Sequence, residues 1–359
     1  MSSRNRENRH QAIREATDVH ALRNIRESEQ DRLSAALSST PVNAALDSLS
    51  ELHDALINRA LELVETELAR LGFGAPPVPY AYLLFGSGGR FEQTFSSDQD
   101  SGIVFANPET AQEAETYASY FRKFAETAVE FLIELGYPPC EGNVISTNPE
   151  WCLPLREWES KLDGWFAEPS WENVRYLLII ADGRAVAGDA GLADVLKNRF
   201  FTDMLQSPVI VRRMMENTLR HKVLVGIFGQ LLRERYGENA GGLDIKYGAY
   251  IPMVNLFRLL AVQAGIRETS TLGRIAALAH EKKLTLVEAE QASSAFTLLL
   301  RMRLLTAVKT EGSQWIGSGK IPKKQLTKEL THLLKKALKF GKRMQRRVER
   351  EMQDRFGGR

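Results

Sequence analysis

A short apolar run that leads directly into a glycine-rich turn is the feature that most limits what this chain can fold into. Residues 80–85 read YAYLLF, the turn Gly86-Ser87-Gly88-Gly89 follows at once, and a second apolar run, SGIVF, occupies residues 101–105. Short runs rich in apolar and aromatic residues are typical of buried strands, and glycine permits the positive φ that tight turns use. The sequence therefore predicts two neighbouring strands with a glycine turn after the first.

Helical patterns lie on both sides of this pair. Leucines recur at spacings of three and four before Gly72, and residues 76–79 (PPVP) then forbid a helix. Residues 110–135 have helical periodicity that ends at Gly136. Residues 143–146 are a candidate further strand, and residues 174–181 fit either a strand or a buried helix. Helices dominate after residue 185, with candidates at 190–200, 208–235, 252–265, 271–281, 286–311 and 322–355.

These patterns predict an α+β fold. A small mixed-sheet domain would be flanked by an N-terminal helical region and a C-terminal helical domain. The expected boundaries are 1–75 for the N-terminal helices, 76–200 for the sheet domain, 201–320 for the C-terminal helical domain and 321–359 for a basic C-terminal helix.

Composition excludes several other classes of protein. The chain has 359 residues, of which 43% are hydrophobic, so a buried core is available, and the net charge of +2 creates no overall attraction to nucleic acid or membrane. Cys140 and Cys152 are its two cysteines, too few for a disulfide framework or a zinc site. The longest apolar run has about six residues, far short of a membrane span, and the first residues lack the apolar core of a secretory signal. We therefore expect a soluble, cytoplasmic protein that does not bind membranes.

The glycine turn has the groups that a phosphate needs. Gly86, Ser87, Gly88 and Gly89 allow backbone amides to converge on phosphate oxygens, and the Ser87 hydroxyl adds a donor. Arg90 follows with a forked guanidinium that suits phosphate. These five residues are the candidate phosphate-binding residues.

Two aspartates follow at a spacing that suits a metal ion. Asp98 and Asp100 are separated by one residue, so an extended segment places both carboxylates on one face, roughly 6–7 Å apart. Two carboxylates repel each other without a cation, and Mg²⁺ takes one or two carboxylates together with substrate phosphates. We expect Mg²⁺, or Mn²⁺ in its place, and a chemistry of phosphoryl or nucleotidyl transfer.

This arrangement resembles the signature of the polymerase-β-like nucleotidyltransferase superfamily. The closest branch contains the PII-protein uridylyltransferase and related bacterial nucleotidyltransferases fused to CBS or cyclic-nucleotide-binding domains, in which Gly-Ser-x-Gly-Arg-x-Glu precedes Ser-Asp-x-Asp. This chain has Gly86 to Glu92 and Ser97-Asp98-Gln99-Asp100 at those positions. The resemblance covers residues 80–310, and further similar segments are Asn148-Pro149-Glu150-Trp151, residues 181–189, Asp244-Ile245-Lys246 and residues 256–261.

The resemblance implies roles for particular residues. Gly86 and Ser87 would hold the triphosphate, and Asp98 and Asp100 would bind Mg²⁺. A third acid, acting as a metal ligand or general base, would be Asp182, with Glu141 as the alternative. If residues 174–181 are a helix, Asp182 instead stabilises a loop or pairs with Arg184.

The substrate stays open at this stage. The resemblance implies transfer of a nucleoside monophosphate to a hydroxyl, on an acceptor protein in uridylyltransferase-like signal transduction. A catalytically silent nucleotide-binding regulator or adaptor is the first alternative. The second is an RNA-directed transferase, because residues 320–359 hold 14 Lys and Arg against four Asp and Glu, a charge that suits RNA phosphates. The default interpretation of that tail is a solvated charged face.

Overall fold

The computed structural model describes residues 3–220, 223, 231, 241–309 and 315–356, which form two compact units. The first unit comprises the described residues up to Leu162, residues 182–199 and Lys309. The second comprises residues 163–181, the described residues from Phe200 to Val308, and those from Trp315 onward. We call them the sheet unit and the helical unit and describe each by itself.

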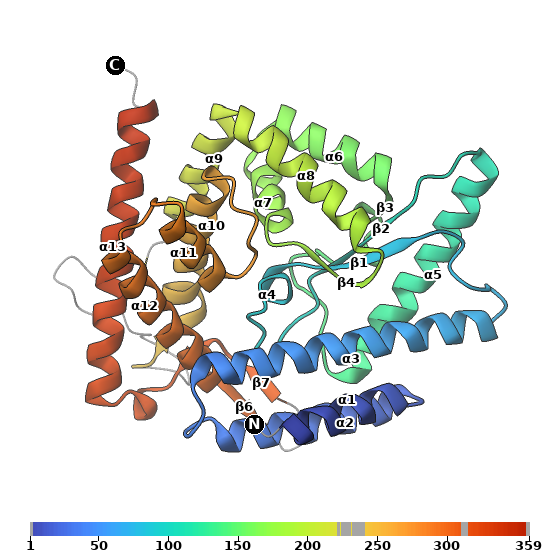
Figure 1. The fold of residues 1–359 in the computed structure, drawn as a ribbon, viewed down its shortest axis with the longest axis horizontal. Helices are drawn as coiled ribbons and strands as arrows, with labels where there is room; N and C mark the ends of the chain where they lie inside the picture. The colour runs from blue at the N-terminus through green and yellow to red at the C-terminus, as the bar shows by residue number, and fades with distance from the viewer. Residues whose placement is uncertain (1–2, 221–222, 224–230, 232–240, 310–314, 357–359) are drawn as a thin grey trace. The chain divides into compact units, whose positions relative to one another are not determined.

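Three helices open the sheet unit: α1 (Ser3–Glu15), α2 (Val19–Ala36) and α3 (Val42–Arg70). Leucines at helical spacing, such as Leu49, Leu52 and Leu56, are fully buried on α3. Both α1 and α2 pack along α3, which also contacts α5 (Ala111–Leu135) and β4 (Arg184–Gly188) (Figure 1). The chain leaves α3 through Gly72 and Gly74, which both have positive φ.

The sheet has four strands in the order β3 (Cys152–Pro154), β2 (Ser101–Phe105), β1 (Tyr80–Leu84) and β4 (Arg184–Gly188). The β1 strand is antiparallel to β2 and β4, and β2 is parallel to β3. Every residue of β1 and β2 is buried. The small mixed sheet predicted from the sequence is confirmed.

Helix α5 (Ala111–Leu135) covers one face of this sheet. A capping box between Thr110 and Glu113 starts the helix, and Gly136 ends it at φ 101°. The ring of Phe121 on α5 stacks on Phe105 of β2, with 4.4 Å between the centroids.

Two sequence-based expectations near the sheet are resolved. Residues 143–146 are not a strand, although the Ser101 amide donates to the Val144 carbonyl at 3.1 Å; the third strand begins later, at Cys152. Residues 174–180 belong to helix α7 (Trp171–Ile180), which Ser170 caps. Asp182 therefore lies in the turn between this helix and β4.

The helical unit contains α9 (Pro208–Arg220), α10 (Ile251–Gln263), α11 (Thr271–His280), α12 (Leu286–Leu305) and α13 (Lys328–Phe356). Helix α12 ends at Leu305, six residues before its expected end, and most of the expected helix beyond residue 220 lies outside the described residues. The basic helix α13 packs on α12 through an apolar face that includes Leu334, Leu338 and Met344.

The remaining elements of the described chain, in both units, are short or connect the others. They are α4 (Gly86–Gly89), η1 (Pro149–Trp151), α6 (Leu155–Ala167), α8 (Ala190–Gln206), β5 (Leu243–Asp244), η2 (Lys246–Tyr250), β6 (Ala307–Lys309), β7 (Trp315–Gly317), β8 (Lys320–Ile321) and η3 (Lys323–Gln325).

The architecture confirms the predicted α+β fold, with a small mixed sheet and helical regions at both ends of the chain. Within the described ranges, no helix combines the length and the apolar character that crossing a membrane requires.

Candidate active site

The glycine turn follows β1 as the single helical turn α4. The Gly89 amide donates to the Phe85 carbonyl at 2.8 Å, and the Arg90 amide donates to the Gly86 carbonyl at 3.3 Å. Gly86 has a φ of +52°, and a Cβ added there would lie 2.0 Å from Oδ2 of Asp100. Only glycine allows the Asp100 carboxylate to rest against the start of the turn.

The two halves of this turn have different surroundings. Gly86 and Ser87 are partly exposed, whereas Gly88 and Gly89 are buried. A Cβ on Gly89 would lie 2.1 Å from the Asp182 carbonyl oxygen and 2.8 Å from that of Leu84. The first half is therefore accessible to a ligand, and the second half packs against the chain.

Asp98 and Asp100 lie on the accessible side of the segment that enters β2. Gln99 between them is buried, and its Nε2 donates to the carbonyls of Tyr137 at 2.7 Å and Val129 at 3.3 Å. Both aspartates are partly exposed. Because side chains alternate along an extended segment, this burial pattern places the two carboxylates together on the face opposite Gln99.

Cys140 joins the site, although nothing in the sequence pointed to it. Its thiol donates a hydrogen bond to the Asp100 carboxylate. Burial, followed by the charge and the hydrogen bond of Asp100, raises the pKa of this thiol to about 12. Glu141, the alternative third acid, is the next residue and lies in an exposed turn.

Arg90 and Asp182 form a buried ion pair. The Nη1 atom of Arg90 lies 2.6 Å from Oδ2 of Asp182, and its Nε lies 2.8 Å from Oε2 of Glu92. All three side chains are at most 5% exposed. This places the Arg90 guanidinium between two buried carboxylates, and it joins the start of β4 to the glycine turn.

The loop between the turn and the aspartates is held by the N-terminal helices. Gln30 Nε2 donates to the Phe95 carbonyl at 2.8 Å, and Ser50 Oγ donates to the Phe91 carbonyl at 3.0 Å. His53 Nε2 donates to the Thr94 carbonyl at 3.0 Å and its Nδ1 accepts from the Tyr137 hydroxyl at 2.6 Å. Burial, and then the nearby Arg26, lower the pKa of His53 to about 3.

Arg184, on β4, supports the turn from another direction. Its Nε donates to the Gly88 carbonyl at 3.0 Å, and its Nη2 pairs with Oδ1 of Asp54 at 2.6 Å. Its guanidinium lies 3.8 Å from the ring centroid of Phe91, a residue with a left-handed φ of 57°. Backbone of this kind is unfavourable for a bulky residue, so the contacts around Phe91 maintain it.

The accessible groups fit a magnesium ion whose coordination shell is completed by oxygens of the substrate. Asp98 and Asp100 supply hard oxygen ligands on one face, and Asp100 lies against the turn proposed to hold phosphate. In the part of the chain that the structure describes, no three His, Cys, Asp or Glu side chains are arranged to hold a metal. Two carboxylates with phosphate and water oxygens are a coordination set that Mg²⁺ accepts.

A mixed sheet with a glycine turn and paired aspartates defines a member of the nucleotidyltransferase superfamily. The family model described as "Putative nucleotidyltransferase DUF294" matches residues 28–172, and that described as "Putative nucleotidyltransferase substrate binding domain" matches residues 208–352. The chain belongs to this DUF294 nucleotidyltransferase family. No curated protein matches it. The first match includes Asp98, Asp100 and Glu141, whereas Asp182 lies between the two matched ranges.

Proposed function

We propose that this chain is a Mg²⁺-dependent enzyme that transfers a nucleoside monophosphate from a nucleoside triphosphate to a hydroxyl group. The observation that carries the proposal is the contact between Asp100 and Gly86, which joins a pair of carboxylates to an accessible glycine turn. In the reaction, the acceptor oxygen forms a bond to the α-phosphorus. The bond from that phosphorus to the bridging oxygen breaks, and pyrophosphate leaves.

Each accessible residue has a role in this proposal. Asp98 and Asp100 would hold the cation, and the Ser87 hydroxyl with the first amides of the turn would bind phosphate oxygens. A bound Mg²⁺ would neutralise charge on the phosphates and favour the nucleophilic form of the attacking oxygen. Gly88 and Gly89 keep the turn packed against the sheet unit, so their role is to position Gly86 and Ser87.

For the third carboxylate, the structure favours Glu141 over Asp182. Glu141 is exposed and directly follows Cys140, which contacts Asp100. Asp182 is 1% exposed and paired with Arg90. In our proposal Glu141 takes the acceptor proton as a general base, and Asp182 and Arg90 are positioning residues.

The proposed acceptor is a hydroxyl on another protein, in the manner of a PII-protein uridylyltransferase. The sequence resemblance supports this choice, and so does the description of the family model over residues 208–352 as a substrate-binding domain. A tyrosine hydroxyl on a signalling protein would be a typical acceptor of that kind.

Transfer is tested by incubating the protein with each α-³²P-labelled nucleoside triphosphate, Mg²⁺ and cell lysate. Wild type should label an acceptor and release pyrophosphate, and the Asp98→Asn/Asp100→Asn variant should do neither. The matched control is Asp194→Asn, which changes an exposed carboxylate on α8. Labelling that survives in the double variant would reject the two aspartates as the metal ligands.

Two further variants separate the candidate third acids. Glu141→Gln should reduce the transfer rate and leave thermal stability unchanged, because the side chain is exposed. Asp182→Asn should lower the stability by about 3 kcal/mol or more, since it removes one partner of a buried ion pair. The opposite pattern, with Glu141→Gln fully active, would return Asp182 to the role of third acid.

A nucleotide-binding regulator without catalysis is the second candidate. It is favoured by the absence, within the described residues, of a cluster of three ligating side chains at Asp98 and Asp100. Tight binding of nucleoside triphosphate without pyrophosphate release, in the presence of acceptor proteins, would support this candidate. Steady pyrophosphate release would reject it.

An RNA acceptor is the third candidate and rests on α13. Lys335, Lys336 and Lys339 are exposed on this helix, opposite its apolar face. Because that apolar face is buried, deleting the helix would disrupt the helical unit, and charge removal is the sharper test. RNA retention that falls steeply with salt in wild type, and is lost in Lys335→Gln/Lys336→Gln/Lys339→Gln, would support RNA as the acceptor.

A further inference from the structure

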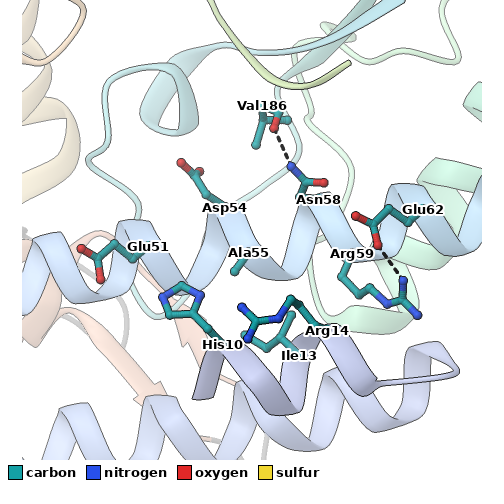
Figure 2. A pocket seen from close by; sticks show the side chains of 10 residues that line it. All are labelled: His10, Ile13, Arg14, Glu51, Asp54, Ala55, Asn58, Arg59, Glu62 and Val186. Atoms are coloured by element: carbon teal, nitrogen blue, oxygen red, sulfur yellow. Dashed lines mark hydrogen bonds and ion pairs between the residues drawn. The ribbon is translucent and has the colours of Figure 1, made fainter. Parts of the chain in front are cut away.

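A cavity of about 470 Å³ opens in the sheet unit, between α1, α3 and the strand β4 (Figure 2). None of its lining residues belongs to the glycine turn or to the segment that contains Asp98 and Asp100. Its volume lies within the range of small-molecule sites. It is lined by His10, Ile13, Arg14, Glu51, Asp54, Ala55, Asn58, Arg59, Glu62 and Val186.

Several charged groups around this cavity already have partners. Glu51 pairs with Arg6 and Arg9, and Arg59 pairs with Glu62. The carboxylates of Glu51 and Glu62 are therefore already engaged by arginines.

Other lining groups keep open hydrogen-bonding capacity. Arg14 donates to the neutral Gln11 at 2.6 Å and forms no ion pair with any described residue. Asn58 donates its Nδ2 to the Val186 carbonyl at 3.1 Å, which leaves its Oδ1 as an acceptor. Asp54 has one oxygen on Arg184, and burial raises the pKa of its carboxyl even though Arg184 opposes that shift.

The cationic group and the hydrogen-bond acceptors among these open groups lie on different sides of the cavity. Figure 2 shows Arg14 and His10 on α1 at one side of α3, and Asp54 and Asn58 at the other side of α3, on the side of Val186. Ile13 and Ala55 add apolar surface between these two sides, and Val186 lies beyond Asn58. A cation on one side and two acceptors on the other fit a ligand with opposite groups at its two ends.

We propose that this cavity binds a small dipolar molecule, whose anionic group meets Arg14 and whose N–H donors meet Asp54 and Asn58, and that its binding steadies the glycine turn. Two sources supply this chemistry. Free amino acids carry a carboxylate and an ammonium group, and nucleoside monophosphates such as AMP and CMP carry a phosphate and an exocyclic amine.

The link to the glycine turn runs through two contacts of Arg184. Asp54 lines the cavity and pairs with Arg184 at 2.6 Å, and Arg184 donates to the Gly88 carbonyl at 3.0 Å. Asn58 holds the Val186 carbonyl of the same strand. A donor bound at the free oxygen of Asp54 fixes the carboxylate that pairs with Arg184, and this strengthens the hold of Arg184 on the turn. The regulatory meaning of this link rests on the proposed function, but the binding and the link do not.

Binding is tested by calorimetric titration of the full chain with the common amino acids and, in a separate arm, with AMP and CMP. We expect one arm to contain a ligand, and Arg14→Ala to weaken its binding by about 10–100-fold, the cost of a lost hydrogen bond to a charged group. Arg70→Ala, at the exposed end of α3 and outside the cavity, is the matched control and should bind like wild type. If neither arm binds, or if Arg14→Ala binds as tightly as wild type, the site is rejected.

The link is tested by hydrogen exchange of the amides from Gly86 to Phe91. The ligand found by titration should slow their exchange in wild type, and the slowing should be absent in Asp54→Asn at saturating ligand. Unchanged exchange in wild type would overturn the link, whether or not the chain binds nucleoside triphosphates. Failure of nucleotide transfer with a positive exchange result would count against the proposed function alone.

Discussion

At the scale of single residues, the glycines of the turn meet two different structural requirements, which the local sequence does not distinguish. Gly86 faces the side chain of Asp100, which can rotate, whereas Gly89 faces the backbone carbonyls of Leu84 and Asp182, which cannot. The same residue type therefore serves ligand access at one position and close packing at the other.

Substituting Gly89 tests whether this part of the turn requires close packing against backbone. Gly89→Ala places a Cβ 2.1 Å from the Asp182 carbonyl oxygen, so the backbone must shift, and we expect a loss of about 1–3 kcal/mol in the free energy of unfolding. The comparison is Gly164→Ala on α6, where a new Cβ meets nothing within 4 Å and should add about 0.5–1 kcal/mol. Urea unfolding of both variants measures the difference. Equal stability of the two variants would contradict the close approach at Gly89.

His53 makes stability depend on pH in a defined direction. Its pKa is about 3 in the folded state and 6.5 as the ordinary value, so below pH 6.5 the unfolded chain binds a proton that the folded chain does not. Stability from this group is complete above pH 6.5 and is lost as pH falls toward 3, by about 2 kcal/mol between pH 7 and pH 5.

The comparison variant is His53→Gln, whose amide can donate to the Thr94 carbonyl without titrating. The free energy of unfolding of wild type, minus that of His53→Gln, should fall by this amount between the two pH values. A difference that stays constant with pH would show that His53 is not held neutral by burial.

At the scale of elements, the N-terminal helices form part of the site's support. Gln30 on α2 and Ser50 and His53 on α3 each bind a backbone carbonyl of the loop between Phe91 and Phe95. Without them, these carbonyls lose their partners, and the face of the sheet unit that α3 covers becomes exposed.

Truncation tests this role. Removing residues 1–75 should abolish cooperative unfolding and folded-state solubility, because α2 and α3 are lost together. Removing residues 1–17 deletes only α1 and should leave a folded but less stable protein, since Arg59 also loses its acceptor, the Ala16 carbonyl. Circular dichroism and thermal unfolding compare the two. If the chain without residues 1–75 unfolds as cooperatively as the full chain, the three N-terminal helices are dispensable for folding.

The sequence is informative where the signal is local. Apolar runs, capping residues and the glycine turn located β1, β2 and α5, and the pattern Asp98-Gln99-Asp100 placed two carboxylates on one face. The strands β3 and β4 were not predicted. The strand β3 has only three residues, and β4 is only partly buried, so neither forms a clear apolar run. Contacts between residues far apart in the sequence could not be predicted. The contact of Cys140 with Asp100 and the pairing of Asp182 with Arg90 join residues 40 or more positions apart.

At the scale of the whole molecule, ligand binding should appear as stability. A Mg²⁺–nucleoside triphosphate complex at 100 times its dissociation constant should add about 2.7 kcal/mol to the free energy of unfolding of wild type. Gly86→Ala should lose this gain, because its Cβ would displace the Asp100 carboxylate from the turn. Thermal unfolding with and without the complex measures both. An undiminished gain in Gly86→Ala would place nucleotide binding elsewhere in the chain.

The order of the strands along the chain has a consequence for synthesis in the cell. The strand β1 needs β4 on one side, and β4 begins at Arg184, about 100 residues after Leu84. At translation rates of about 5–20 residues per second, that edge of β1 waits roughly 5–20 s for its partner. During this interval the nascent polypeptide presents an open, apolar strand edge, so its yield should depend on chaperones and on the speed of the ribosome.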